Sequence, residues 1–309
     1  MGQRTPALAL TLTALCAGFG ALEAQEQQQP TFRSGTNVVT VDVSVRKGNI
    51  PVAGLTAADF AVTDNAVPQT VTSVGIERLP VNVSLLLDTS GSVSNIIDSL
   101  KSQMRDAAAL LDSSDRLRLL VFAGDASQVF PMQPPGADLP LDAVQANGLG
   151  TSLYDSLAAA LFRQRELNRG ELVVAFSDGI DTTSAMSVKK LEQVASRSEA
   201  VLHAFVVRSP ELIQLCKGTQ DIQGMPRLCD QSDLKRVAEI TGGRMYETLA
   251  GNHIPQGLSR ALDEFRTSYT LRYALTGVAR PGWHDIKVKV THAAARGATV
   301  RARRGYFGG

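Results

Sequence analysis

Oxygen-bearing side chains follow two apolar runs of the sequence and precede one helical pattern. Asp88, Ser90 and Ser92 come directly after the first run, Asp178 follows the second, and Thr151 stands just before the helical pattern. Ligands of open α/β sheets lie beyond the carboxyl ends of the strands, so these oxygens can converge there. Carboxylate and hydroxyl oxygens are the donors that a hard divalent cation prefers. These five residues are therefore our candidate metal ligands.

The same residues also have a purely structural interpretation. Asp88 and Asp178 could cap turns, Ser90 and Ser92 could serve the helix that follows them, and Thr151 could be a helix N-cap. Any one motif taken alone fits this interpretation. All five residues together, in this order and on these elements, favour a metal site.

The elements that would position these residues alternate between strands and helices. Residues 83–87, with Ser84 as the one polar exception, and residues 172–176 are apolar runs, typical of parallel strands buried on both faces. Residues 117–122 and 201–207 are further strands, and residues 96–111 carry apolar side chains at helical spacing. More helices are expected at 153–167, 188–195, 234–240 and 254–265. The alternation predicts an α/β fold with a doubly wound, mostly parallel sheet and helices on both faces.

The two flanks of this core read as antiparallel strands. Val39, Val41, Val43 and Val45 alternate with polar residues, and residues 269–275 and 286–290 show the same period of two. Neither flank is long enough to form a stable domain by itself. We therefore expect residues 36–79 and 268–309 to pair into a small antiparallel β-sandwich around an α/β domain at 80–267.

The N-terminal residues have the order of a secretory signal. Arg4 leads into the apolar run 6–22, and Ala24 precedes a polar, Gln-rich stretch. We assign residues 1–24 to a signal peptide and 25–35 to a linker, with an uncleaved N-terminal anchor as the alternative. No later stretch approaches the roughly 20 apolar residues of a membrane helix, so the mature chain is expected to have no membrane span. The protein is expected to be exported, to the periplasm or the extracellular space.

Cys216 and Cys229 remain as a pair once the signal peptide has left with Cys16. In an oxidising compartment a disulfide is the natural interpretation, with two unpaired thiols as the alternative. The segment that carries both cysteines follows the strand 201–207, which places it on the metal side of the sheet. There it is either a plain insertion or an element that shapes partner specificity.

Charge excludes one class of partner. The chain has 31 Lys and Arg against 30 Asp and Glu, a formal net charge of +1. A nucleic-acid-binding protein would carry a basic surface, so no nucleic acid is expected as partner. The oligomeric state does not follow from the sequence.

The Asp-x-Ser-x-Ser motif at Asp88, Ser90 and Ser92, with Thr151 and Asp178 after it, resembles the metal-ion-dependent adhesion site (MIDAS) of von Willebrand type A domains. The resemblance covers about residues 80–267. It implies Mg²⁺ at the upper edge of the sheet, with Mn²⁺ or Ca²⁺ as alternatives. The flanks further resemble bacterial exported proteins related to this group, in residues 52–55, 59–60 and 304–306.

The resemblance implies a binding module and not an enzyme. Only Asp88 and Asp178 of the five are charged, so a bound dication would be neutralised and could still accept an Asp or Glu of a protein partner. A metal-dependent phosphoryl-transfer or hydrolytic enzyme is the alternative. Phosphotransferases of the haloacid dehalogenase type need a second aspartate where Ser90 stands, and neither a Gly-x-Ser-x-Gly elbow nor a P-loop is present. A structural envelope protein with an empty site is the other alternative.

Overall fold

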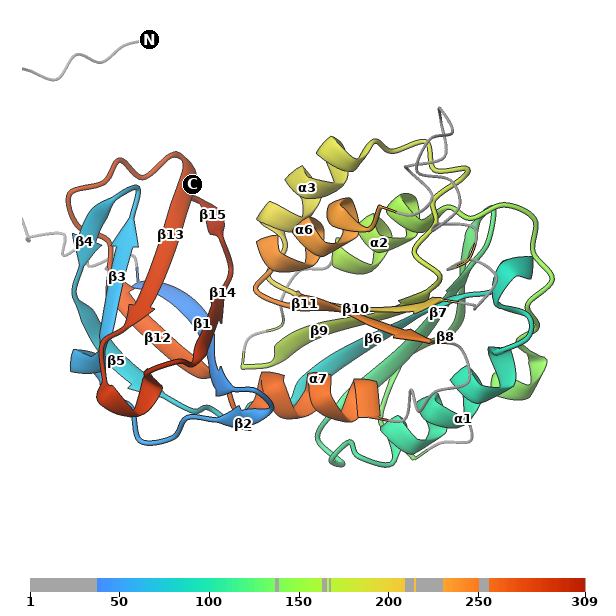
Figure 1. The fold of residues 1–309 in the computed structure, drawn as a ribbon, viewed down its shortest axis with the longest axis horizontal. Helices are drawn as coiled ribbons and strands as arrows, with labels where there is room; N and C mark the ends of the chain where they lie inside the picture. The colour runs from blue at the N-terminus through green and yellow to red at the C-terminus, as the bar shows by residue number, and fades with distance from the viewer. Residues whose placement is uncertain are drawn as a thin grey trace, which may run out of the picture. The chain divides into compact units, whose positions relative to one another are not determined.

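The centre of the fold is a six-stranded sheet with the order β11-β10-β9-β6-β7-β8 (Figure 1). The computed structural model describes residues 38–308 apart from 137–138, 163–165, 167, 209–213, 215–229 and 250–255. Neighbouring strands are parallel except for β7 and β8, which pair antiparallel. The strands are β6 (Val81–Asp88), β7 (Arg116–Phe122), β8 (Ala126–Gln133), β9 (Gly170–Ser177), β10 (Val201–Arg208) and β11 (Arg244–Leu249). Every residue of β6 and β9 is buried, which explains why both strands are mainly apolar.

Helices cover both faces of this sheet (Figure 1). Side chains alternate along a strand, so Leu85 and Leu87 of β6 pack in one hydrophobic cluster and Leu86 packs in another. The first cluster includes side chains of α1 (Ile97–Ala108) and α7 (Gln256–Arg266). The second includes side chains of α2 (Leu153–Leu161), α3 (Val188–Arg197) and α6 (Ser232–Ile240). The chain thus has an α/β fold, as predicted.

Helix α2 is shorter than its sequence pattern predicts. The pattern runs to residue 167, whereas α2 ends at Leu161. Ala160 and Leu161 are buried, but Phe162 is exposed and its ψ of 68° is not helical. Packing of an apolar face supplies most of a helix's stability, so the helix ends where that packing stops.

Two antiparallel sheets combine strands from both ends of the described chain. One has the order β14-β1-β12-β5, with β2 beside β1, and the other has the order β15-β13-β3-β4. Val41 of β1 stands opposite Leu271 of β12, and Val62 of β3 stands opposite Val288 of β13. Side chains from both sheets share one hydrophobic cluster. The strands are β1 (Val38–Lys47), β2 (Ile50–Pro51), β3 (Phe60–Asp64), β4 (Val67–Gln69), β5 (Val71–Gly75), β12 (Tyr269–Ala274), β13 (Gly282–Val290), β14 (Thr299–Ala302) and β15 (Gly305–Gly308).

Some predicted features lie outside the described residues. These are the signal peptide at 1–24, the linker at 25–35 and both Cys216 and Cys229. Within the described part of the chain, no helix has the length and apolar character needed to cross a membrane.

Candidate metal site

Asp88 is the last residue of β6 and is 0% exposed. One carboxylate oxygen, Oδ1, accepts a hydrogen bond of 2.9 Å from the backbone N–H of Ser90. The hydroxyl oxygens of Ser90 and Ser92 lie 2.9 Å apart, at the start of the turn that leads into α1. The end of β6 therefore gathers the first three candidate ligands, as the spacing of the motif predicts.

The end of a second strand, β9, lies beside Asp88. In the register of β6 and β9, Leu87 stands opposite Phe176, so the next residue of β9, Ser177, lies next to Asp88. The Ser177 hydroxyl donates a 2.6 Å hydrogen bond to Asp88 Oδ2 and accepts one of 3.0 Å from Gly179 N–H. Sequence reasoning missed Ser177. Its hydroxyl at the end of an apolar run was visible, but its partner depends on a pairing across 89 residues.

Asp178 follows Ser177 in the turn after β9 and is also buried. Its Oδ1 accepts a hydrogen bond of 3.0 Å from the backbone N–H of Ile180, which orients the carboxylate within the turn. Gly179 has a φ of +82°, a conformation that glycine adopts without strain. The turn thus holds a second buried carboxylate near the end of β6.

Thr151 reaches the same edge through the loop that precedes α2. Gly148 in this loop forms a parallel bridge with Ser90. The backbone N–H of Thr151 donates to Thr182 Oγ1 at 2.8 Å, and its carbonyl accepts from Thr182 N–H at 2.9 Å. The loop after Asp178 therefore positions Thr151, and the structure brings all five predicted residues to the carboxyl edge of the sheet.

The electrostatics of this edge disfavour the ionised form of Asp88. Burial raises the pKa of Asp88 to about 6, although the hydrogen bonds from Ser177 and Ser90 oppose the shift. The negative charge of Asp178 raises the pKa of Asp88 further. Burying a carboxylate beside another one costs free energy unless a positive charge joins them. A bound cation would offset this cost.

The donor set fits a hard cation. The five candidate residues supply two carboxylates and three hydroxyls, all oxygen donors, which suits Mg²⁺ with water in its remaining positions. In the described part of the chain, no group of three or more His, Cys, Asp or Glu side chains is placed to hold a metal ion. His203, a predicted core histidine, is buried in β10 with its ring 5.8 Å from that of Tyr246.

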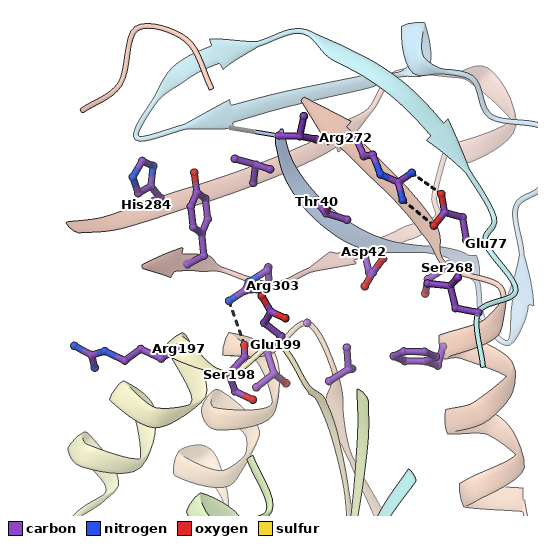
Figure 2. Close-up of a pocket in the computed structure, with 18 of the residues that line it drawn as sticks. Thr40, Asp42, Glu77, Arg197, Ser198, Glu199, Ser268, Arg272, His284 and Arg303 are labelled. Atoms are coloured by element: carbon purple, nitrogen blue, oxygen red, sulfur yellow. Dashed lines mark hydrogen bonds and ion pairs between the residues drawn. The ribbon is translucent and has the colours of Figure 1, made fainter. Parts of the chain in front are cut away.

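A cavity of about 640 Å³ lies elsewhere, and none of the five candidate ligands lines it. Figure 2 shows Arg272 and Glu77 pointing toward one another, and Arg303 pointing toward Ser198. Arg272 pairs with Glu77 through two hydrogen bonds, and Arg303 donates to the carbonyl of Ser198 at 3.2 Å. These hydrogen bonds join polar groups that line the cavity, and we assign no chemistry to this cavity.

Comparison with known proteins identifies the fold. No protein-family model and no curated protein sequence matches the chain. A structure of proximal thread matrix protein 1 from the mussel byssus, with a zinc-occupied MIDAS motif, is 15% identical over 65% of this chain and 49% of that one, with a TM-score of 0.50. A von Willebrand factor type A structure from Catenulispora acidiphila is 10% identical over 89% and 75%, with a TM-score of 0.48. BatB from Bacteroides thetaiotaomicron is 17% identical over 60% and 98%, with a TM-score of 0.46.

At these identities the likeness concerns the fold. The α/β part of this chain has the fold of a von Willebrand type A domain, which is the fold that the resemblance implies.

Proposed function

We propose that this protein is a divalent-cation-dependent binding module with a MIDAS-type site. Mg²⁺ is held by Asp88, Ser90, Ser92, Thr151 and Asp178, some of them through water, and an Asp or Glu of a protein partner completes its coordination. Mn²⁺ and Ca²⁺ are the alternative cations. The protein acts by binding and not by catalysis.

One observation carries this proposal: two buried carboxylates stand with three hydroxyls at one edge of the sheet, and both burial and the charge of Asp178 raise the pKa of Asp88. A dication would neutralise both carboxylates and leave its open positions to water or a ligand. A third or fourth carboxylate in the site would repel an acidic partner, and serines and a threonine do not. The zinc-occupied MIDAS motif of the mussel protein supports a divalent cation in a domain of this fold.

The proposal extends to the rest of the chain. The six-stranded sheet is the doubly wound core of a module at 80–267, and the flanks 36–79 and 268–309 form a β-sandwich attached to it. A signal peptide at 1–24 exports the protein, and a disulfide between Cys216 and Cys229 closes an insertion beside the metal.

The experiment that tests this function captures partners from an envelope extract of the producing cell. The immobilised chain is exposed to the extract in Mg²⁺ and in EDTA, with Asp178→Ala as the matched control. We expect proteins that are retained in Mg²⁺, are released by EDTA and are not retained by Asp178→Ala. Equal retention under all three conditions would show that the bound proteins do not use the metal, and would favour a structural envelope role.

A further inference from the structure

A loop beside the candidate metal site presents one large apolar side chain to solvent. The loop is Gly148-Leu149-Gly150, directly before Thr151. Leu149 is 91% exposed, the most exposed large hydrophobic residue in the described part of the chain. A single exposed leucine is ordinary on a protein surface. Leu149 differs because the backbone around it is held firmly in place.

The backbone on both sides of Leu149 is anchored. Gly148 N–H donates to the carbonyl of Thr89 at 3.1 Å, and the Gly148 carbonyl accepts from Gly91 N–H at 3.1 Å. After the tip, Ser152 N–H donates to the carbonyl of Ala123 at 2.6 Å. Thr89 and Gly91 flank Ser90, so the loop is attached to the metal-binding segment itself.

The two glycines around Leu149 are required by this arrangement. A Cβ on Gly148 would collide with the Cβ of Ala123. Gly150 has a φ of +74°, and a Cβ there would collide with the Thr183 side chain. The loop is therefore packed closely against its neighbours while its central side chain is left in water. A side chain held in this way loses little further freedom when a partner covers it.

A hollow of about 330 Å³ lies next to the same segment. Its apolar lining comes from Val121, Val129 and Val144, and Thr89 and Asn147 also line it. Thr89 directly precedes Ser90, and Asn147 directly precedes Gly148. The hollow and Leu149 thus flank the bridge between the metal-binding turn and the Thr151 loop.

We propose that Leu149 and this hollow form the specificity site for the partner, which presents an acidic residue with an apolar neighbour. The inference rests on the proposed function, because the acidic residue is the one that completes the metal's coordination. The cation attracts the carboxylate, and the apolar neighbour covers Leu149 and enters the hollow lined by Val121 and Val129. An exposed peptide segment of a protein is the ligand of this chemistry.

The test uses a display library of short random peptides with a central acidic residue, selected on the full chain in Mg²⁺ and eluted with EDTA. We expect the wild-type chain to enrich Leu, Ile, Val, Met or Phe beside the acid. For a synthetic peptide with the enriched sequence, Leu149→Ser should weaken binding about tenfold or more, because the contact with a leucine side chain is lost. Leu110→Ser, at another exposed leucine just after α1, is the matched control and should leave the affinity unchanged.

The outcomes separate this inference from the proposed function. Selection of acidic peptides in Mg²⁺ without an apolar neighbour, or equal affinity for wild type and Leu149→Ser, would overturn the inference alone. Failure of EDTA to elute any enriched peptide, or equal affinity of the synthetic peptide in Mg²⁺ and in EDTA, would overturn the proposed function and the inference with it.

Discussion

Replacing Asp88 by Asn should stabilise the metal-free protein and at the same time abolish its response to metal. The pKa of Asp88 is raised from 3.8 to about 6 in the folded chain, chiefly by burial. A shift of this size corresponds to about 3 kcal/mol, which the folded state loses when Asp88 ionises. Asn avoids this cost, and it can still accept from Ser90 N–H and donate to the Ser177 hydroxyl.

The sign of the effect fixes its pH dependence. A carboxyl whose folded pKa lies above its unfolded value favours folding at low pH, and this contribution is lost as the pH rises from about 4 through about 6. Above that range in EDTA, Asp88→Asn should be more stable than wild type by up to about 3 kcal/mol. The difference should shrink as the pH falls from 6 towards 4.

The assay is urea unfolding of both proteins at pH 7.5 and pH 4.5, with EDTA or Mg²⁺. At saturating Mg²⁺, about 100 times the dissociation constant, wild type should gain about 2.7 kcal/mol and Asp88→Asn nothing. Asp125→Asn, at an exposed aspartate in the turn between β7 and β8, removes the same charge and should change stability by less than about 0.5 kcal/mol. A metal-free Asp88→Asn protein that is less stable than wild type at pH 7.5 would refute the reasoning.

Three further predictions concern other parts of the chain. Burial lowers the pKa of His203 from 6.5 to about 4, so its contribution to stability is lost as the pH falls through that range. In urea unfolding, His203→Gln should reduce the change in the free energy of unfolding over this range by up to about 3 kcal/mol. An unchanged pH profile would contradict this. Asp64 is fully buried and accepts hydrogen bonds from His284, Tyr273 and Tyr306. Asp64→Ala should therefore lower the free energy of unfolding, measured in urea, by about 3 to 5 kcal/mol. A loss below about 1 kcal/mol would count against a structural role for this cluster. Cys216 and Cys229 should react with a thiol reagent in the unfolded mature protein only after reduction. Reduction should lower the free energy of unfolding by about 3 kcal/mol, because the disulfide closes a loop of about 14 residues. Free thiols before reduction would exclude the disulfide.

The parts of the fold that depend on local patterns could be predicted from the sequence. The mainly apolar sequence of β6 indicates a strand buried on both faces, and the order Asp88, Ser90, Ser92 places oxygens at its end. Helix α1 follows from the spacing of Leu100 and Met104 on its buried face. These signals are visible because each is set by neighbours in the chain.

The parts that depend on distant neighbours could not be predicted. The role of Ser177 requires the register of β6 against β9, and the end of α2 at Leu161 depends on where its packing partner stops. The apolar character of Leu149 suggests burial, whereas the structure leaves it in solvent on a loop that is anchored through Gly148 to Thr89.

The most direct test of the account is a calorimetric titration of the metal-free chain with Mg²⁺, in parallel with Asp178→Ala and Ser90→Ala. The account predicts one Mg²⁺ per chain for wild type, and no binding to either variant at unchanged far-UV circular dichroism. Binding of Mg²⁺ by both variants with the wild-type affinity would contradict it, because the cation would then be held by other residues.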